Sequence, residues 1–343
     1  MIVIDGSYGE GGGQILRSSL CMSCITGKAF HIYNIRKGRK KPGLMQQHLT
    51  SVQAAREISD ADVKGAEYGS TELEFRPRTL KSGKFIFDVA EERGSAGSTA
   101  LVLQAIMVPL LKAKNVSEII LKGGTHTEWS PPYHYLEWVL FPMLKKLGIK
   151  IESKLKKWGF YPRGGGEIYI KINPVEEIKN WDFTERGRLQ KLWGISVVCD
   201  LPRHIAERQR RASYNLLRRY SPEIEIWEVK GLSKGTFFFL VAEYENSICG
   251  FSSLGAPGKP AEKVGEEATE EFLKHEKRGG ALDKHLADQI INFLTLGKGE
   301  FRFTTSEITL HLLTNIWVIK KFKDVEIKIK GKEGERGEIL IKI

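Results

Sequence analysis

A seven-residue segment that occurs twice constrains the fold of this chain more than any other feature. Residues 166–172 read Gly-Glu-Ile-Tyr-Ile-Lys-Ile, and residues 337–343 read Gly-Glu-Ile-Leu-Ile-Lys-Ile. Both copies alternate apolar and polar side chains, as a half-buried strand does, and both follow an amphipathic helix, a shorter strand and a glycine-rich turn. Such a repeat predicts a fold assembled from copies of one supersecondary unit.

The unit can be traced three times. The second copy has a predicted helix over 132–147, the third has one over 309–322, and a fainter first copy has one over 44–58. Each helix leads into a two-stranded hairpin, and a strand, a helix and a strand precede it. We therefore expect a mixed α/β (α+β) fold of three units, each consisting of strand, helix, strand, helix and hairpin.

The third unit is too long for this pattern. The first two units end near Arg76 and Ile172, whereas the third would continue to Ile343. The excess is about the size of a small domain. We place it as an inserted α/β domain over 185–280, because the segments 193–199 and 236–244 read as strands of a separate sheet.

The larger domain would then comprise residues 1–184 and 281–343.

The whole chain is basic, with a net charge of +11, a pI of about 9.3 and a mean hydropathy of -0.27. This balance favours a polyanionic partner such as nucleic acid over a membrane, although a solubilising surface has the same charge. The longest apolar run, 100–111, is too short to span a bilayer.

The first residues and the cysteines indicate the compartment. Met1 to Asp5 reads as a strand without a targeting signal, so we expect a cytoplasmic protein. Cys21 and Cys24 form a C-x-x-C on a predicted helix, with no second close pair to complete a zinc site. Buried thiols are the favoured interpretation, a redox pair is the alternative, and the sequence does not decide between them.

A glycine-rich turn joins the first strand to the helix that follows. Residues 9–14 read Gly-Glu-Gly-Gly-Gly-Gln. Glycines allow a phosphate or metal to approach the backbone, and the helix N-terminus points at it; the pattern is neither a Walker A loop nor a dinucleotide fingerprint. Glu10 is a candidate ligand of a divalent metal, or alternatively a charge that complements the helix dipole. Arg17 is a candidate phosphate contact.

Two further segments carry charge or small residues. Residues 35–43 read Ile-Arg-Lys-Gly-Arg-Lys-Lys-Pro-Gly, a basic turn that is either a phosphate clamp or a solvated charge run. Residues 94–98 read Gly-Ser-Ala-Gly-Ser and open the apolar helix that carries Gln104. Pro131, before a predicted helix, could stack on a base, although a proline at a helix start is ordinary.

The remaining candidates lie near the C-terminus. Asp288 and Gln289 border an apolar helical face and could bind a base or ribose, or could be surface residues. His311 lies near the start of an apolar, helix-period stretch. A neutral imidazole held there could attack phosphorus, while backbone N–H groups stabilise the phosphate charge. Taken alone His311 reads as a core histidine, but the turn at Glu10 and the segment 286–289 favour a nucleophile.

Taken together, these segments resemble the RNA 3'-terminal phosphate cyclase family over essentially the whole chain. The most specific matches are residues 9–17, 35–44, 94–98, 164–166, 286–289 and 311–315. The resemblance implies three βαβαββ units related to the enolpyruvyl transferases, with a smaller thioredoxin-like domain inserted in the third unit.

The resemblance also implies an ATP-dependent reaction in three steps. His311 would attack the α-phosphorus of ATP, forming a histidine–AMP adduct and releasing pyrophosphate. AMP would pass to an RNA 3'-phosphate, and the neighbouring 2'-hydroxyl would then close a 2',3'-cyclic phosphate and release AMP. Glu10 would bind the divalent metal, Mg or Mn.

Matching positions extend the implied site. The residues matching the adenylate pocket are Gln104, Pro131, Phe251, His285, Asp288 and Gln289. The residues matching contacts to the RNA end or the triphosphate are Arg17, Arg36 and Arg39. The family commonly has tyrosine where this chain has His285, so we expect weaker or pH-sensitive nucleotide binding. Pro131 and Pro132 remain alternatives for the stacking proline.

Two other classes compete with this interpretation. One is a non-catalytic cyclase-like RNA-binding protein that serves ribosome assembly, and His311 argues against it because such proteins lack the nucleophile. The other is a small-molecule transferase of the enolpyruvyl type. The basic turn at 36–41, the net charge and the inserted segment argue against that class.

Overall fold

The computed structural model describes residues 1–89, 96–178 and 180–343. Within these ranges the strands form four sheets of four strands each. The strands of the first sheet have the order β1-β2-β4-β3, with β1 and β2 parallel and the other neighbours antiparallel. Its members are β1 (Ile2–Asp5), β2 (Phe30–Tyr33), β3 (Asp62–Lys64) and β4 (Leu73–Arg76).

Two further sheets repeat this topology, in the orders β5-β6-β8-β7 and β9-β14-β16-β15. The second sheet contains β5 (Lys84–Asp88), β6 (Ser117–Gly123), β7 (Ile151–Lys157) and β8 (Gly166–Ile172). The third contains β9 (Trp181–Phe183), β14 (Glu300–Thr305), β15 (Glu326–Lys330) and β16 (Gly337–Lys342). The predicted α/β architecture of three βαβαββ units is confirmed, and the two seven-residue repeats are the equivalent strands β8 and β16.

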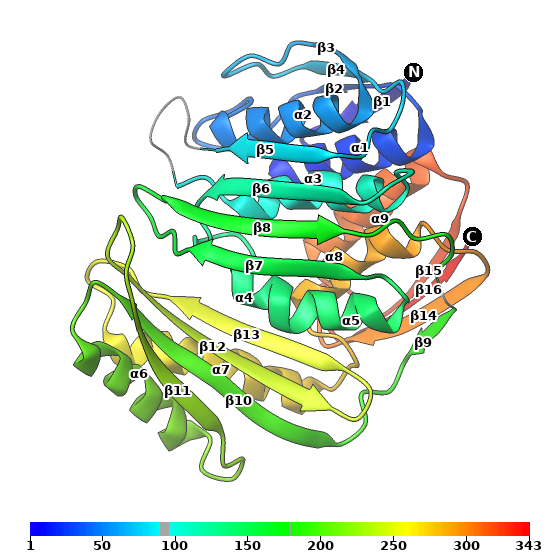
Figure 1. The fold of residues 1–343 in the computed structure, drawn as a ribbon. Coiled ribbons are helices and arrows are strands. Elements are labelled where there is room, and N and C mark those ends of the chain that lie inside the picture. The colour runs from blue at the N-terminus through cyan, green and yellow to red at the C-terminus, as the bar shows by residue number, and fades with distance from the viewer. Residues whose placement is uncertain (90–95, 179) are drawn as a thin grey trace.

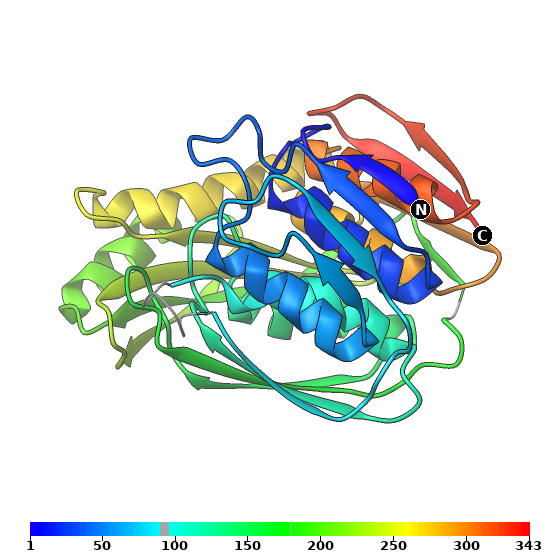
Figure 2. The ribbon, with the colours of Figure 1, turned by 90° about the horizontal axis from the view of Figure 1, so that it is seen from above.

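The helices of the three units lie in the interior, with the sheets around them (Figures 1 and 2). They are α1 (Gly13–Thr26), α2 (Gln46–Ser59), α3 (Thr99–Leu111), α4 (Tyr133–Tyr135), α5 (Phe141–Lys146), α8 (Lys284–Leu294) and α9 (Leu310–Phe322). Every residue of α3 is buried except Gln104, which is half-buried. No helix in the described ranges is long and apolar enough to cross a bilayer.

One predicted helix is interrupted. Instead of a single helix over 132–147, a π-helical turn, η1 (Leu136–Leu140), separates α4 from α5. The N–H of Phe141 donates to the carbonyl of Leu136, five residues earlier. Pro142 follows directly and has no N–H to donate, so the α-helical pattern cannot continue through this turn. Periodicity alone does not reveal such a turn.

The fourth sheet belongs to the inserted segment and has the order β11-β10-β12-β13. Its elements are β10 (Leu189–Cys199), α6 (Arg203–Leu216), β11 (Glu223–Val229), β12 (Gly235–Tyr244), β13 (Ile248–Leu254) and α7 (Ala261–Arg278). In Figure 1 they form a separate layer below the second unit. The predicted boundaries at 185 and 280 fall just after β9 and just before α8, between the first strand and first helix of the third unit.

The inserted sheet packs on the second unit through aromatic rings. Trp138 of η1 lies 4.9 Å from Trp193 of β10, measured between ring centroids. His126 and His134 share a hydrogen bond of 2.8 Å between Nε2 and Nδ1, and the ring of His126 lies 4.8 Å from that of Phe237 on β12. Burial lowers the pKa of His134 to about 3 and that of His126 well below its ordinary value. Both imidazoles are therefore neutral at pH 7.

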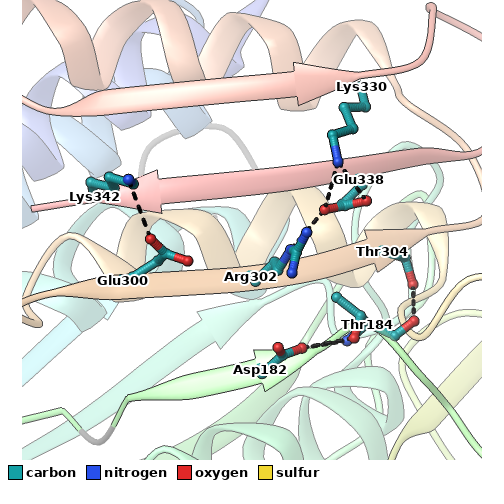
Figure 3. A network of polar contacts seen from close by, with 8 residues as sticks. All are labelled: Asp182, Thr184, Glu300, Arg302, Thr304, Lys330, Glu338 and Lys342. Atoms are coloured by element: carbon teal, nitrogen blue, oxygen red, sulfur yellow. Dashed lines mark hydrogen bonds and ion pairs between the residues drawn. The ribbon is translucent and has the colours of Figure 1, made fainter.

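Ion pairs cover the outer side of the third sheet, as Figure 3 shows. Arg302 on β14 donates from Nε to Glu338 on β16 at 2.7 Å, and Lys330 on β15 lies 3.4 Å from the same carboxylate. At the end of β9, Thr184 accepts a hydrogen bond of 2.8 Å from the Thr304 hydroxyl. This hydrogen bond and the parallel pairing with β14 hold the three-residue strand β9 in its sheet at the point where the chain leaves for the insert.

The buried histidine pair predicts a pH-dependent stability. Because the unfolded chain binds protons at both histidines near pH 6.5 and the folded protein does not, folding is favoured less as the pH falls below that value. Between about pH 6.5 and pH 5 the His134 site alone should cost roughly 2 kcal/mol. Denaturant unfolding at several pH values should show a smaller loss for His134→Phe than for the wild type. His204→Phe, at an exposed position on α6, should keep the full pH dependence, and equal slopes for all three proteins would contradict the prediction.

Candidate active site

Helices of the first and third units meet at one buried amide, the side chain of Asn315 on α9. Asn315 is 0% exposed. Its Oδ1 accepts from Gln14 Nε2 at 2.9 Å and from the Ser18 hydroxyl at 2.5 Å, and its Nδ2 donates to the carbonyl of Asp288 at 2.6 Å. A fully buried amide must be hydrogen-bonded on both sides, so these bonds fix α9 against α1 and α8.

His311 is the second residue of α9, one turn before Asn315. Thr309 caps the helix and accepts a hydrogen bond of 3.0 Å from the N–H of Leu312. The imidazole is half-buried, and its Nδ1 has no hydrogen-bond partner among the described residues. Burial lowers the pKa of His311, and the charges of Arg17 and Arg39 lower it further. The imidazole is thus a neutral base at a helix N-terminus, beside two cations.

Arg17 on α1 is the buried cation of this group, with 7% of its surface exposed. One guanidinium nitrogen donates to Gln14 Oε1 at 2.8 Å, but in the described part of the chain its Nε has no acceptor. Burial lowers the pKa of Arg17 to about 10, which leaves it charged at pH 7. Burial also raises the pKa of Asp288 well above its ordinary value. A cation with donor capacity to spare, held next to a neutral histidine, can bind a phosphate.

The basic turn brings two further arginines to the same place. Arg36 has a left-handed φ of 54° and donates to the carbonyl of Gly43 at 2.9 Å, which closes the turn. Arg39 forms an ion pair with Glu10. His48 of α2 is buried, and burial, together with Arg17 and Arg36, lowers its pKa to about 3. Lys37, Lys40 and Lys41 of the same segment are exposed, so the structure places Arg36 and Arg39 near the centre and the remaining cations in solvent. The phosphate role of the segment stays a prediction.

Gly13 shows how closely this cluster is packed. A Cβ added at Gly13 would lie 2.5 Å from Nε2 of His48 and 2.8 Å from a guanidinium nitrogen of Arg17. Any side chain there would displace both groups, so glycine is required by close approach. The sequence indicated the glycines of this turn, but it did not identify His48 as a site residue, because nothing in the local pattern joins α2 to α1.

Glu10 lies on the glycine-rich turn before α1. Its N–H donates to the Thr314 hydroxyl of α9 at 3.3 Å, and its carboxylate is paired with Arg39. Nowhere in the described ranges do three or more His, Cys, Asp or Glu side chains gather as a metal site. A metal on Glu10 would thus have one protein carboxylate, an arrangement that fits Mg²⁺ completing its shell with phosphate oxygens and water. The metal role of Glu10 stays a prediction.

The residues predicted for the adenylate pocket fall into separate groups. Gln104 donates to Gln289 at 3.4 Å, and both border a small cavity together with Arg17. The carbonyl oxygen of Gln104 is buried, and no described residue donates to it. Gln289 donates to the carbonyl of His285 at 3.0 Å, which connects this cavity with the start of α8. Asp288, described above, follows on the same helix.

A second small pocket lies at the start of α8. Phe251 of β13 and His285 line it, and Asp283 below them caps α8 by accepting from the N–H groups of His285 and Leu286 at 2.9 Å. Asp283 also accepts from the Tyr135 hydroxyl at 2.8 Å, so α4, α8 and the inserted sheet are joined. The sequence did not identify Asp283, although an aspartate just before an apolar helix is an N-cap signal.

Three predictions remain apart from this cluster. Pro131 is half-buried on the turn before α4, and its stacking role stays a prediction. Gly94 and Ser95 of the small-residue turn lie outside the described residues. Cys21 and Cys24 are buried free thiols, and burial raises the pKa of Cys24 to about 12, which suits the interpretation as buried thiols and not as a redox pair.

The fold and the site define an α/β protein of three repeated units whose centre gathers a neutral histidine, a buried arginine and a glycine-rich turn. A family model described as RNA 3'-terminal phosphate cyclase matches residues 8–329. The chain therefore belongs to the RNA 3'-terminal phosphate cyclase family of enzymes.

Curated relatives agree. Proteins named RNA 3'-terminal phosphate cyclase are 44% identical in Nostoc punctiforme, covering 96% of both chains, and 43% identical in Ignicoccus hospitalis, covering 96% of this chain and 95% of the relative. The relative of that name from Pyrococcus furiosus is 44% identical and covers 99% and 98%. The enolpyruvyl transferase NikO of Streptomyces tendae is similar in structure with a TM-score of 0.38 at 7% identity, covering 98% of this chain and 47% of that chain, a likeness too slight to add to the family assignment.

Replacing Asn315 tests whether its amide holds the site together. Asn315→Ala removes the acceptor that Gln14 and Ser18 share and leaves the buried carbonyl of Asp288 without its amide donor, so we expect a loss of roughly 3 kcal/mol of unfolding free energy. Asn292→Ala is the matched control, because Asn292 is half-buried near the same cavity and no described residue donates to its Oδ1. Denaturant unfolding should show a clearly smaller loss for the control. Equal losses would show that Asn315 is not the connecting residue.

Proposed function

We propose that this enzyme converts an RNA 3'-terminal phosphate into a 2',3'-cyclic phosphate, using ATP and a covalent histidine–AMP intermediate. The observation that carries the proposal is His311: a neutral imidazole at the start of α9, with a free Nδ1 among the described residues, beside Arg17 and Arg39. Family membership and the names of the relatives support RNA and ATP as the substrates. We place the reaction in the cytoplasm.

In the first step a ring nitrogen of His311 attacks the α-phosphorus of ATP. A P–N bond forms, the P–O bond to the β-phosphate breaks, and pyrophosphate leaves with the electron pair. The attacking nitrogen needs its lone pair, which the lowered pKa of His311 keeps available at neutral pH. The cations Arg17 and Arg39 and the N–H groups at the start of α9 would offset the charge that develops on the phosphate.

In the later steps AMP serves as an activating group. An oxygen of the RNA 3'-phosphate attacks the adenylyl phosphorus, and the P–N bond breaks to restore the imidazole. The RNA 2'-hydroxyl then attacks the activated phosphorus, loses its proton and displaces AMP. Because the attacking hydroxyl is on the same ribose, the last step depends on orientation more than on a further catalytic group. Arg36 and the buried Arg17 are the residues we propose for holding the RNA phosphate.

We propose that the nucleotide lies along α8. Gln104, Asp288 and Gln289 would contact the ribose or base edge, and Phe251 and His285 would hold the ring at the helix start. The unpaired carbonyl oxygen of Gln104 supports this, because a buried acceptor without a donor is uncommon. A divalent metal on Glu10 would neutralise the triphosphate, and Glu10 would have to exchange Arg39 for the metal.

Labelling with α-labelled ATP tests the nucleophile. We expect the wild type to acquire acid-labile, alkali-stable label that is lost when RNA with a 3'-phosphate is added, and His311→Ala to acquire none while keeping its fold by circular dichroism. His204→Ala, at an exposed position on α6, is the control and should be labelled like the wild type. Persistent labelling of His311→Ala would remove the assignment. An unlabelled wild type that still binds RNA would favour the non-catalytic RNA-binding class.

Metal titration of the same labelling reaction tests Glu10. Glu10→Gln removes the carboxylate charge at nearly constant size, so we expect the magnesium concentration at half-maximal labelling to rise on the order of tenfold. Glu57→Gln changes an exposed carboxylate on the far part of α2 and should leave the titration unchanged. The metal role of Glu10 is refuted if the Glu10→Gln curve coincides with that of the control.

A further inference from the structure

A large groove lies between the second unit and the inserted sheet, with a volume of about 1130 Å³. Its walls come from the turn after β6, the β7–β8 connection, the β11–β12 connection and the chain from the end of β13 into α7. These connections gather at the left of Figure 1, on the side where β7 and β13 end. None of the residues predicted for the adenylate pocket lines the groove.

The groove begins next to the proposed phosphate site. Gln47 of α2 lines it, and its Oε1 accepts a hydrogen bond of 2.9 Å from the N–H of Ser98. The next residue, His48, borders Gly13 together with Arg17, as described above. A chain whose last phosphate lies against Arg17 could therefore continue past Gln47 into the groove.

Two aromatic side chains on the groove wall are exposed. Trp129 is 94% exposed and has a left-handed φ of 60°, and Tyr161 on the opposite connection is 75% exposed. A bulky residue rarely adopts a left-handed backbone conformation, and an exposed indole does not gain the free energy that burial would give. The stability of the fold therefore explains neither the backbone conformation of Trp129 nor the exposure of its ring. Flat exposed rings in a groove are what single-stranded nucleic acids stack on.

The charge of the groove identifies its occupant further. Arg163 and Lys234 line it, both are exposed, and within the described ranges neither has an acidic partner. Two other cations on the wall, Arg208 and Lys259, are neutralised by ion pairs with carboxylates. The two cations outnumber Glu128, an exposed carboxylate that also lines the groove. Cations without an acidic partner beside exposed rings fit a chain of phosphates and bases, whereas an apolar peptide would leave both cations unpaired.

We propose that this groove binds the single-stranded RNA that precedes the 3'-terminal phosphate. Bases stack on Trp129 and Tyr161, and the phosphate backbone runs past Arg163 and Lys234. The inference rests on the proposed function for the identity of the RNA end, and it adds a role for the inserted segment. The groove holds the nucleotides upstream of the end, so it lets the enzyme favour long RNA over short fragments.

The experiment measures the affinity of 3'-phosphorylated RNA as a function of length. A dinucleotide reaches only the phosphate site, whereas an oligonucleotide of about 12 nucleotides also fills the groove. For the long RNA, Trp129→Ala should weaken binding by about tenfold, and Trp129→Phe should restore most of it because the ring is kept. Dinucleotide binding should be the same for all three proteins.

The double variant R163Q/K234Q tests the backbone contacts. For the long RNA, the slope of log affinity against log salt should become shallower by about 0.7 for each cation removed. Lys114→Gln is the matched control: Lys114 is exposed after the C-terminal end of α3, the opposite end from Ser98. Its slope should equal that of the wild type.

Two results would overturn the groove as an RNA site. One is unchanged binding of the long RNA to Trp129→Ala and R163Q/K234Q, and the other is an equal loss for the dinucleotide and the long RNA. Adenylylation without RNA is measured on the same proteins and should be unaffected. If the wild type is not adenylylated but the variants still lose their preference for long RNA, the groove assignment stands and the proposed reaction falls.

Discussion

The buried side chain of Asn315 is the contact on which the arrangement of the site depends. Its amide is hydrogen-bonded to α1 on one side and α8 on the other, and it is one turn from His311 on the same helix. The bonds thereby fix the distance between the imidazole and Arg17, which lies on α1. A buried amide that loses its hydrogen bonds destabilises the folded state, so an arrangement of α1, α8 and α9 that breaks these bonds is disfavoured.

The same centre explains the electrostatics. Burial and, after it, the charge of Arg17 lower the pKa of both His48 and His311, so both histidines are neutral at pH 7. In such surroundings a phosphate interacts with Arg17 more strongly than it would at the surface. Arg17 therefore serves a phosphate substrate in two ways. Its positive charge attracts the phosphate, and the same charge keeps the imidazole of His311 unprotonated, so that a ring nitrogen can attack phosphorus.

The inserted segment is connected to this centre through Asp283. That side chain caps α8 and also accepts from the Tyr135 hydroxyl and from the N–H of Gly250 on β13. The start of α8, with His285, is thus held by the inserted sheet as well as by its own unit. The inserted sheet also supplies one wall of the groove at Trp129. One segment thereby contributes to the nucleotide side and to the proposed RNA side of the enzyme.

The three-unit architecture could be predicted from the amino-acid sequence, because alternation and helical periodicity are local properties that are kept in each repeat. It also proposed Glu10, Arg17 and His311 as candidates from their places in a glycine-rich turn and at helix starts, and the family resemblance added Arg36 and Arg39; the roles of all five stay predictions. It could not identify His48 or Asp283, the π turn before Pro142, or the groove at Trp129. Those depend on side chains from separate elements meeting in space, and periodicity carries no information about such contacts. Their packing in three dimensions is what brings the glycine-rich turn, the basic turn, His48 of α2 and His311 of α9 to one centre.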